Sequence, residues 1–140
     1  MKRKIFSFWA LICAFVSLAA TAPKDAPYRI EVKMTDIKDT SKVFLAFYYN
    51  GKTYSKDTAQ FNGKGVAVFD GSKRKDKEKQ RLEEGMYIVY FKQDKFFDLL
   101  VGKDQNIKLK ADTTDLTPVV TQGEESVYFS KLVKFMSDKN

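Results

Sequence analysis

The side chains that could carry out chemistry are few in this chain of 140 residues. It has no histidine, and its only cysteine is Cys13. Imidazole is the usual base near neutral pH and a common metal ligand, while thiolates act as nucleophiles and as paired zinc ligands. The composition therefore excludes sites that need an imidazole or two thiols. Carboxylates, basic clusters and aromatic rings remain as candidates.

One carboxylate, Asp98, stands inside an apolar run between Phe97 and Leu99. Burial there would raise its pKa, as in a general acid. Strand alternation, however, places Asp98 on the opposite face, together with Phe96 and Leu100. The sequence marks no partner acid, so we expect an edge or surface position. A hydrolase built on carboxylates alone would need two acids that converge in a cleft.

Two further acids, Asp112 and Asp115, flank a pair of threonines and could contribute to a calcium site. The segment lacks the dense oxygen ligands and the distal glutamate of a calcium-binding loop. Aspartate and threonine side chains also bond nearby backbone groups in turns. We therefore expect a turn here, and the sequence predicts no catalytic residue, no metal site and no cofactor.

The segment Lys73–Arg81 holds six positive and two negative residues. Its first three residues, Lys73, Arg74 and Lys75, are candidates for binding phosphates or anionic lipid head groups. The segment lacks aromatic residues that would stack on bases, so a nucleic-acid partner is not expected. Because charge runs usually stay in water, we favour the alternative of a solvated connection between two strands.

Tyrosines are the second group of candidate binding residues. Tyr48, Tyr54, Tyr87 and Tyr90, together with Tyr49, could line a groove for a carbohydrate or a peptide. Aromatic residues also build the cores and cross-strand pairs of small sandwiches, and a core position is the more common outcome. A structure in which all these tyrosines are buried would exclude the groove.

Residues 1–22 have the pattern of a secretory signal peptide. Basic residues at positions 2–4 precede an apolar stretch without a charge, Ile5 to Ala20. This stretch is short for a membrane-spanning helix, and an uncleaved N-terminal anchor is the alternative. Pro23 follows one candidate cleavage site, so the position of the cut stays open. We expect a protein of the periplasm or cell envelope, without a disulfide and without a stable membrane span after cleavage.

The chain after residue 27 alternates short apolar runs with glycine turns, as mainly β proteins do. Seven strands are expected, at residues 28–34, 43–49, 52–60, 66–69, 86–91, 96–101 and 106–110, with a short edge strand at Val119-Val120. Val43–Tyr49 and Met86–Phe91 are apolar on both faces, which predicts central strands that are covered on both sides. This pattern favours an antiparallel β-sandwich, with a small barrel as the alternative.

The last segment changes its apolar period from two residues to about 3.6. Tyr128, Leu132, Phe135 and Met136 follow the spacing of one apolar helix face, which predicts an amphipathic helix over about Glu124–Ser137. The expected organisation is a signal peptide (1–22), a short linker (23–27), a β-sandwich domain (28–121) and a C-terminal helix (122–140).

The formal charge of +7 comes from 25 basic and 18 acidic residues. Removal of the signal takes away three basic residues, which leaves 22 minus 18, or +4. The segment Lys73–Arg81 contributes six minus two, again +4, so the remainder has 16 residues of each sign. A broad surface for binding polyanions is therefore not expected.

Several segments resemble a Bacteroidetes domain of unknown function that precedes TlpA/ResA-like thioredoxin domains in envelope proteins. They are Asp57–Gly71, Leu82–Val89, Asp94–Val101, Asp104–Ile107 and the ending with Gly123, Tyr128-Phe129 and Leu132–Met136. In such families a helical segment and a thioredoxin fold with Trp-Cys-x-x-Cys follow the β-domain. The redox cysteines are absent here, so the resemblance implies no oxidoreductase activity. It implies an orphan accessory domain or a shortened version of a longer protein.

These features predict an exported, non-enzymatic β-sandwich module of the cell envelope that binds or positions a partner. The resemblance implies a thioredoxin-like protein, or a client of one, as that partner. The alternative is a domain that binds a small ligand or a glycan through exposed tyrosines. The oligomeric state stays open.

Overall fold

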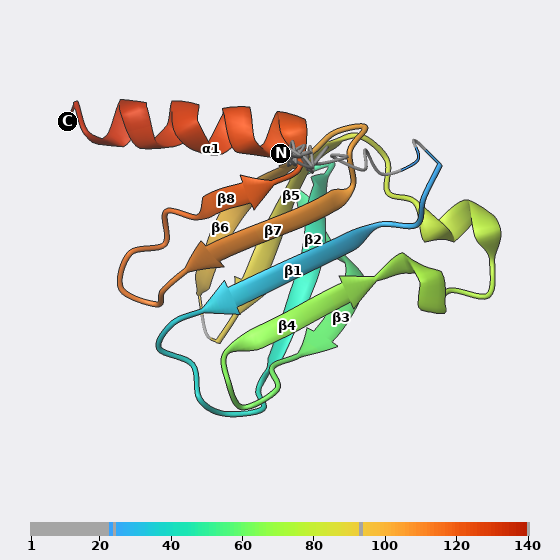
Figure 1. Ribbon diagram of the computed structural model, residues 1–140, viewed down its shortest axis with the longest axis horizontal. Helices are drawn as coiled ribbons and strands as arrows, with labels where there is room; N and C mark the ends of the chain where they lie inside the picture. The colour runs from blue at the N-terminus through green and yellow to red at the C-terminus, as the bar shows by residue number, and fades with distance from the viewer. Residues whose placement is uncertain (1–22, 24, 93, 140) are drawn as a thin grey trace, which may run out of the picture.

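The computed structural model describes residues 23, 25–92 and 94–139. The predicted signal peptide, with Cys13, lies outside the described residues. Two four-stranded sheets face each other, and an α-helix lies along one side of them (Figure 1). The predicted mainly β sandwich with a C-terminal helix is confirmed. Within the described part of the chain, no helix is long and apolar enough to cross a membrane.

The sheets are called sheet I and sheet II below. Sheet I has the order β4 (Val66–Asp70), β1 (Arg29–Met34), β7 (Asn106–Ala111) and β8 (Val119–Gln122). Sheet II has the order β3 (Lys52–Gln60), β2 (Lys42–Tyr49), β5 (Gly85–Phe91) and β6 (Lys95–Val101). The remaining elements are the 3-10 turns η1 (Gly71–Lys73) and η2 (Lys77–Gln80) and the helix α1 (Glu124–Ser137). The predicted edge strand is β8, and α1 has the predicted bounds.

One pairing at the centre of sheet I departs from the antiparallel pattern of the others. There β1 and β7 pair in parallel, with Ile30 opposite Ile107 and Val32 opposite Leu109. The other described pairs are antiparallel. A parallel pair needs a long crossover connection, and here all of sheet II lies between β1 and β7 along the chain. The predicted antiparallel sandwich is therefore confirmed, and this one parallel pair is a feature that the sequence did not indicate.

The hydrophobic core lies between the sheets and follows from strand alternation. In β1, Ile30, Val32 and Met34 point inward and are fully buried, while Arg29 and Lys33 are exposed on the outer face. Other strands contribute Val43, Leu45, Ala67, Phe69, Tyr87, Val89, Phe91, Phe97, Leu99, Val101, Ile107 and Leu109. Removal of this apolar surface from water is the main force that holds the two sheets together.

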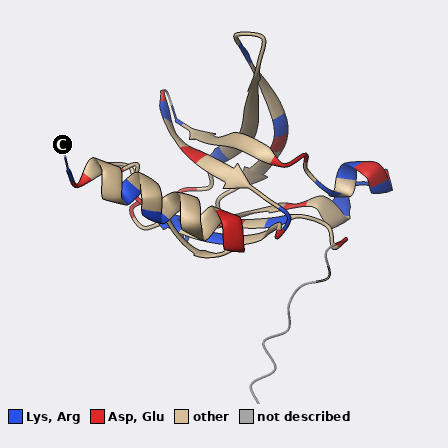
Figure 2. Ribbon diagram, turned by 90° about the horizontal axis from the view of Figure 1, so that it is seen from above, with Lys and Arg blue, Asp and Glu red and all other residues tan. Residues whose placement is uncertain are grey.

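The helix α1 closes one side of the sandwich, along the edge strands β6 and β8 (Figures 1 and 2). Its inner face carries two serines. Ser126 Oγ donates to Leu100 O of β6 (2.5 Å), and Ser130 Oγ donates to Pro118 O (2.6 Å) and accepts from Val120 N (3.3 Å). The small side chains let the helix approach closely, and their hydroxyls satisfy backbone groups at the strand edges.

The apolar face of α1 points away from the sandwich. Its members share one face as predicted, but each is more than half exposed: Tyr128, Leu132, Phe135 and Met136. Helical spacing therefore predicted the helix and its apolar face correctly. It did not predict that the serine face would pack against the sheets, because that choice depends on the two edge strands.

A buried glutamine ties the end of sheet II to the turn between β6 and β7. Gln105 is 3% exposed. Its Oε1 accepts from Leu82 N (2.9 Å), and its Nε2 donates to Leu82 O (2.8 Å) and to Gly102 O (3.3 Å). The side chain thus pairs with both backbone groups of Leu82 as a neighbouring strand would. Buried polar groups need such partners.

We expect Gln105→Ala to lower the free energy of unfolding by roughly 2–4 kcal/mol, because it leaves two buried backbone groups unpaired. Urea denaturation monitored by far-ultraviolet circular dichroism measures this change. Gln60→Ala is the matched control, since Gln60 is exposed and makes one bond, to Thr40 O. Equal effects of the two substitutions would contradict the role given to Gln105.

Candidate functional site

The outer face of sheet II is rich in apolar and aromatic side chains. Its exposed members are Tyr48 (61% exposed), Met86 (46%), Tyr90 (40%) and Phe96 (44%). We expected β2 and β5 to be covered on both sides, and this expectation is wrong. They are central strands, but in the described part of the chain no element covers their outer face. Exposed apolar surface of this kind is typical of interaction sites.

This face is hollowed at its centre. A depression of ≈ 380 Å³ has Ala46 and Ile88 among its lining residues, each only 4% exposed, although both belong to the outer face. Tyr48, Tyr90 and Phe96 also line it. Three aromatic side chains around two small or aliphatic ones make an apolar site with hydroxyl groups at its margin.

Further aromatic residues lie at the margin of this face. The Phe44 ring packs on Tyr90 at a centroid distance of 5.8 Å, and it lies opposite Tyr90 in the β2–β5 pairing. The lining also includes Thr53 of β3 and Asp94 of the β5–β6 turn. Their hydroxyl and carboxylate groups add hydrogen-bonding capacity to a surface that is otherwise apolar.

The β2–β3 hairpin carries a second run of aromatic rings, on its inner face. Tyr87 in the core contacts Phe47 (6.3 Å between centroids), which stacks on Tyr54 (5.7 Å), and Tyr54 contacts Tyr49 (6.4 Å). Exposure rises along this run, from 5% at Tyr87 to 61% at Tyr49. The hairpin therefore extends beyond the core, and its rings support one another through cross-strand contacts.

The structure separates the four tyrosines that we selected from the sequence. Tyr48 and Tyr90 lie together at the depression, while Tyr54 belongs to the run of rings on the hairpin. Tyr87 is a core residue, and its hydroxyl donates to Glu83 O (3.0 Å). Phe96 was not among the candidate binding residues selected from the sequence. Its two-residue alternation with the outward Asp98 is the signal that indicates an outward ring.

The basic segment Lys73–Arg81 is partly built into the fold. Arg74 Nη2 donates to Asp57 Oδ1 (2.9 Å) and to Lys56 O (2.8 Å), and the buried Tyr28 hydroxyl donates to Asp57 Oδ2 (2.7 Å). Arg74 is therefore committed to a structural network. Lys73 and Lys75 are exposed, and neither lines the aromatic depression.

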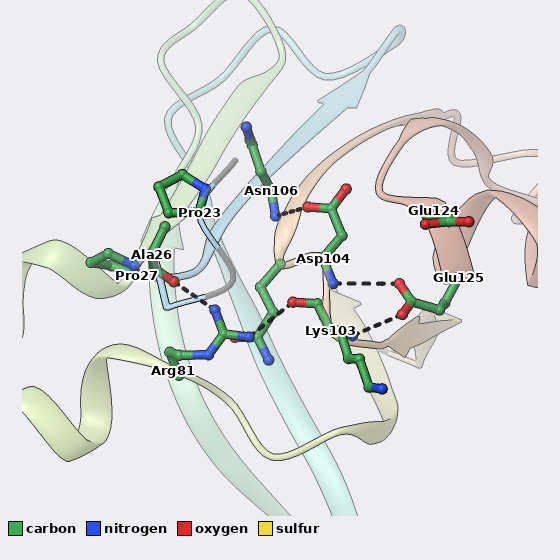
Figure 3. Close-up of a pocket in the computed structure, with 10 residues that line it drawn as sticks. Pro23, Ala26, Pro27, Arg81, Lys103, Asp104, Asn106, Glu124 and Glu125 are labelled. Atoms are coloured by element: carbon green, nitrogen blue, oxygen red, sulfur yellow. Dashed lines mark hydrogen bonds between the residues drawn. The ribbon is translucent and has the colours of Figure 1, made fainter. Parts of the chain in front are cut away.

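A second hollow lies beside the start of α1 and the turn between β6 and β7 (Figure 3). It measures ≈ 610 Å³, and Arg81 crosses it to donate to Ala26 O and Lys103 O, both at 2.8 Å. The Glu125 carboxylate accepts from Lys103 N (3.1 Å) and Asp104 N (3.4 Å). These charged side chains bond to backbone groups of the neighbouring loops, so we assign them a structural role rather than a role in ligand binding.

The aspartates considered from the sequence lie as expected. Asp98 is exposed on the outer face of β6, which is an edge strand. Asp112 Oδ1 accepts from Thr114 N (2.9 Å) and Asp115 N (2.6 Å), so the predicted turn is confirmed. Among the described residues, no group of three or more acidic side chains is arranged to hold a metal ion.

Hydrogen bonds stabilise the charged form of several carboxyl groups. The pKa is lowered at Asp36, Asp39, Asp70, Asp112 and Glu125, and in each case donated hydrogen bonds are the main cause. A general acid at neutral pH needs the opposite shift, which burial would produce. These carboxyl groups cap turns and tie loops.

In comparisons with known proteins, the sequence matches no protein-family model and no curated protein.

Arg74→Ala should lower the free energy of unfolding by roughly 1–3 kcal/mol, because Asp57 and Lys56 O lose their partner in a half-buried network. Lys75→Ala is the matched control: Lys75 is exposed and makes no hydrogen bond or ion pair with another described residue, so a change within about 0.5 kcal/mol is expected. Chemical denaturation of both variants decides the point. A loss at Lys75 as large as at Arg74 would contradict the structural role of Arg74.

Burial and the hydrogen bond to Asp57 raise the pKa of Tyr28 to about 12. The folded-state pKa of Tyr28 lies above its unfolded value of about 10, so its protonated hydroxyl stabilises the folded state fully below pH 10. This contribution to the free energy of unfolding is lost between pH 10 and about 12. The stability of the protein should therefore fall in this range. Tyr28→Phe, although less stable at neutral pH, should show a smaller fall, measured by urea denaturation from pH 8 to about pH 11. An unchanged alkaline fall in Tyr28→Phe would contradict this account.

Proposed function

We propose that this chain is a non-enzymatic binding module of the cell envelope that holds a protein partner on the outer face of sheet II. The observation that carries the proposal is the exposure of Tyr48, Met86, Tyr90 and Phe96 around a depression on that face. Aromatic residues and methionine are enriched in the buried centres of protein interfaces. Side chains of this size, held on paired strands of one sheet, form a rigid surface that loses little conformational entropy on binding.

The sequence supports the remaining parts of the proposal. The signal-like pattern at residues 1–22 supports export, and the resemblance supports a thioredoxin-like envelope protein, or a client of one, as the partner. The chain contains no histidine, and its one cysteine lies within the signal-like segment. The lowered pKa values of several carboxyl groups also fit a structural use of the acids rather than acid catalysis.

A glycan is the second candidate for this face. Tyr48 and Tyr90 could stack on sugar rings, and Thr53 and Asp94 at the same depression could accept or donate hydrogen bonds to sugar hydroxyls. The lining is mainly apolar, which favours a protein over a strongly hydroxylated ligand.

Photo-crosslinking in cells that produce the protein tests the proposal. We expect p-benzoylphenylalanine in place of Tyr90 to give a covalent adduct with one defined protein. The same probe in place of Lys108, which is exposed on the outer face of sheet I, should not give that adduct. Addition of Tyr48→Ser and Phe96→Ser should remove the adduct, while circular dichroism remains unchanged, because both side chains lie on the outer face and outside the core.

Two outcomes would contradict the proposal. One is the same set of adducts from both probe positions, and the other is no protein adduct from position 90. A glycan titration separates the second candidate: saturable binding that Tyr48→Ser weakens at least about tenfold, without a protein adduct, would replace the protein partner by a glycan.

A further inference from the structure

We propose that the protein also rests on an anionic phospholipid surface, through the apolar face of α1 and the lysines of the neighbouring outer face of sheet I. This surface is separate from the outer face of sheet II, so the inference does not depend on the function proposed above. A lipid surface is the occupant that combines an apolar boundary with negative head groups.

The apolar part of this surface is a ridge of large side chains. Tyr128, Leu132 and Phe135 lie on the side of α1 opposite its buried serines, and they are 67%, 55% and 57% exposed. The Lys139 ammonium lies 4.2 Å from the centroid of the Phe135 ring. A helix at the side of the molecule, with an apolar ridge and a lysine ammonium over one of its rings, matches the pattern of helices that lie in a membrane interface.

The lysines of α1 lie on one flank of this ridge. Glu125, Phe129 and Val133 follow one another at intervals of four residues and so share one flank of the helix. Glu125 accepts a hydrogen bond from Lys103 N, just after β6, so this flank lies toward sheet II. With 3.6 residues per turn, Lys131 and Lys134 fall on the opposite flank, on the side of β8 and sheet I. Both are exposed.

The outer face of sheet I continues this positive surface. Lys33 of β1 lies opposite Lys110 of β7, and Lys108 precedes them on the same face; all three are exposed. Glu31 shares the face and is paired with Arg29 at 3.4 Å. Figure 2 shows basic segments in α1 and in the neighbouring sheet. Glu31 also lies opposite Lys108, and β8 lies between these lysines and α1. Lysines still outnumber acidic residues on the central strands of this face, one strand away from the apolar ridge.

A second copy of the chain is a weaker candidate for covering the ridge. The exposed parts of its three side chains offer roughly 270–450 Å² per copy, if a large side chain buries about 150–250 Å². A stable interface needs about 800 Å² per partner. A twofold pairing of the ridge would also bring the lysine flanks of both copies close together, whereas head groups of anionic lipids neutralise them.

A tryptophan probe on α1 tests the proposal in the full chain. The sequence has one tryptophan, Trp9, so Trp9→Phe with Phe135→Trp places the only indole on the ridge. We expect brominated phosphatidylcholine to quench this fluorescence in vesicles that also contain phosphatidylglycerol, and not in vesicles of phosphatidylcholine alone. Addition of Lys108→Gln and Lys110→Gln should weaken vesicle binding at least about tenfold.

Trp9→Phe with Tyr48→Trp is the matched control, because Tyr48 lies on the outer face of sheet II and should stay unquenched. Trp9→Phe with Leu132→Trp places the indole about one helical turn earlier on the same ridge. Quenching at this second position shows that the result does not depend on a local change of structure at position 135. Three results would overturn the proposal: no quenching at positions 132 and 135, equal quenching in neutral vesicles, or a blue shift that depends on protein concentration without lipid. The last result would show that a second copy covers the ridge.

Discussion

A two-layer sandwich has one core, and every strand has two faces, so half of the strand positions must face outward. This constraint decides where the large side chains of the protein lie. The core takes the inward residues of seven strands, including Ile30, Val89 and Phe97, while β3 adds only the partly buried Ala59. The strands β2 and β5 are apolar on both faces, and their outward residues, Tyr48 and Tyr90 among them, have no second layer to cover them. Because these strands carry more large apolar residues than the single core can take, an aromatic surface forms on the outer face of sheet II.

Polar side chains close the ends and the open side of the same sandwich. Gln105 pairs with the backbone before β5, Tyr28 and Arg74 share Asp57, and the serines of α1 bond to the edge strands. Because α1 uses its small polar face for packing, its apolar face remains outside. The outer face of sheet II and the apolar face of α1 are thus exposed for the same reason. In each case the opposite face of the element already packs against the sandwich. The two surfaces belong to different elements and adjoin at the hollow that Phe96 lines together with Phe129 and Val133.

Local patterns predicted most of the elements, since the period of two residues and the turn residues act within a few positions. They placed the eight strands and the bounds of α1, and they assigned Asp98 and Asp112 correctly to a surface and a turn. They could not predict the parallel pairing of β1 and β7, which depends on contacts between distant segments. For the same reason they failed to distinguish core tyrosines from exposed ones: Tyr87 and Tyr90 stand three positions apart on one strand and differ only in the face that they occupy.

Nitration of tyrosines in the native protein, mapped by mass spectrometry, tests the central claim most directly. The chain has seven tyrosines, and the structure divides them into an exposed and a buried set. The account predicts rapid modification of the exposed set and protection of Tyr28 and Tyr87; the exposed set is Tyr48, Tyr49, Tyr54, Tyr90 and Tyr128. In purified protein without partner or lipid, protection of Tyr48 and Tyr90 would contradict the account, because it would mean that the outer face of sheet II is covered. Modification of Tyr28 and Tyr87 in the folded state would contradict it equally.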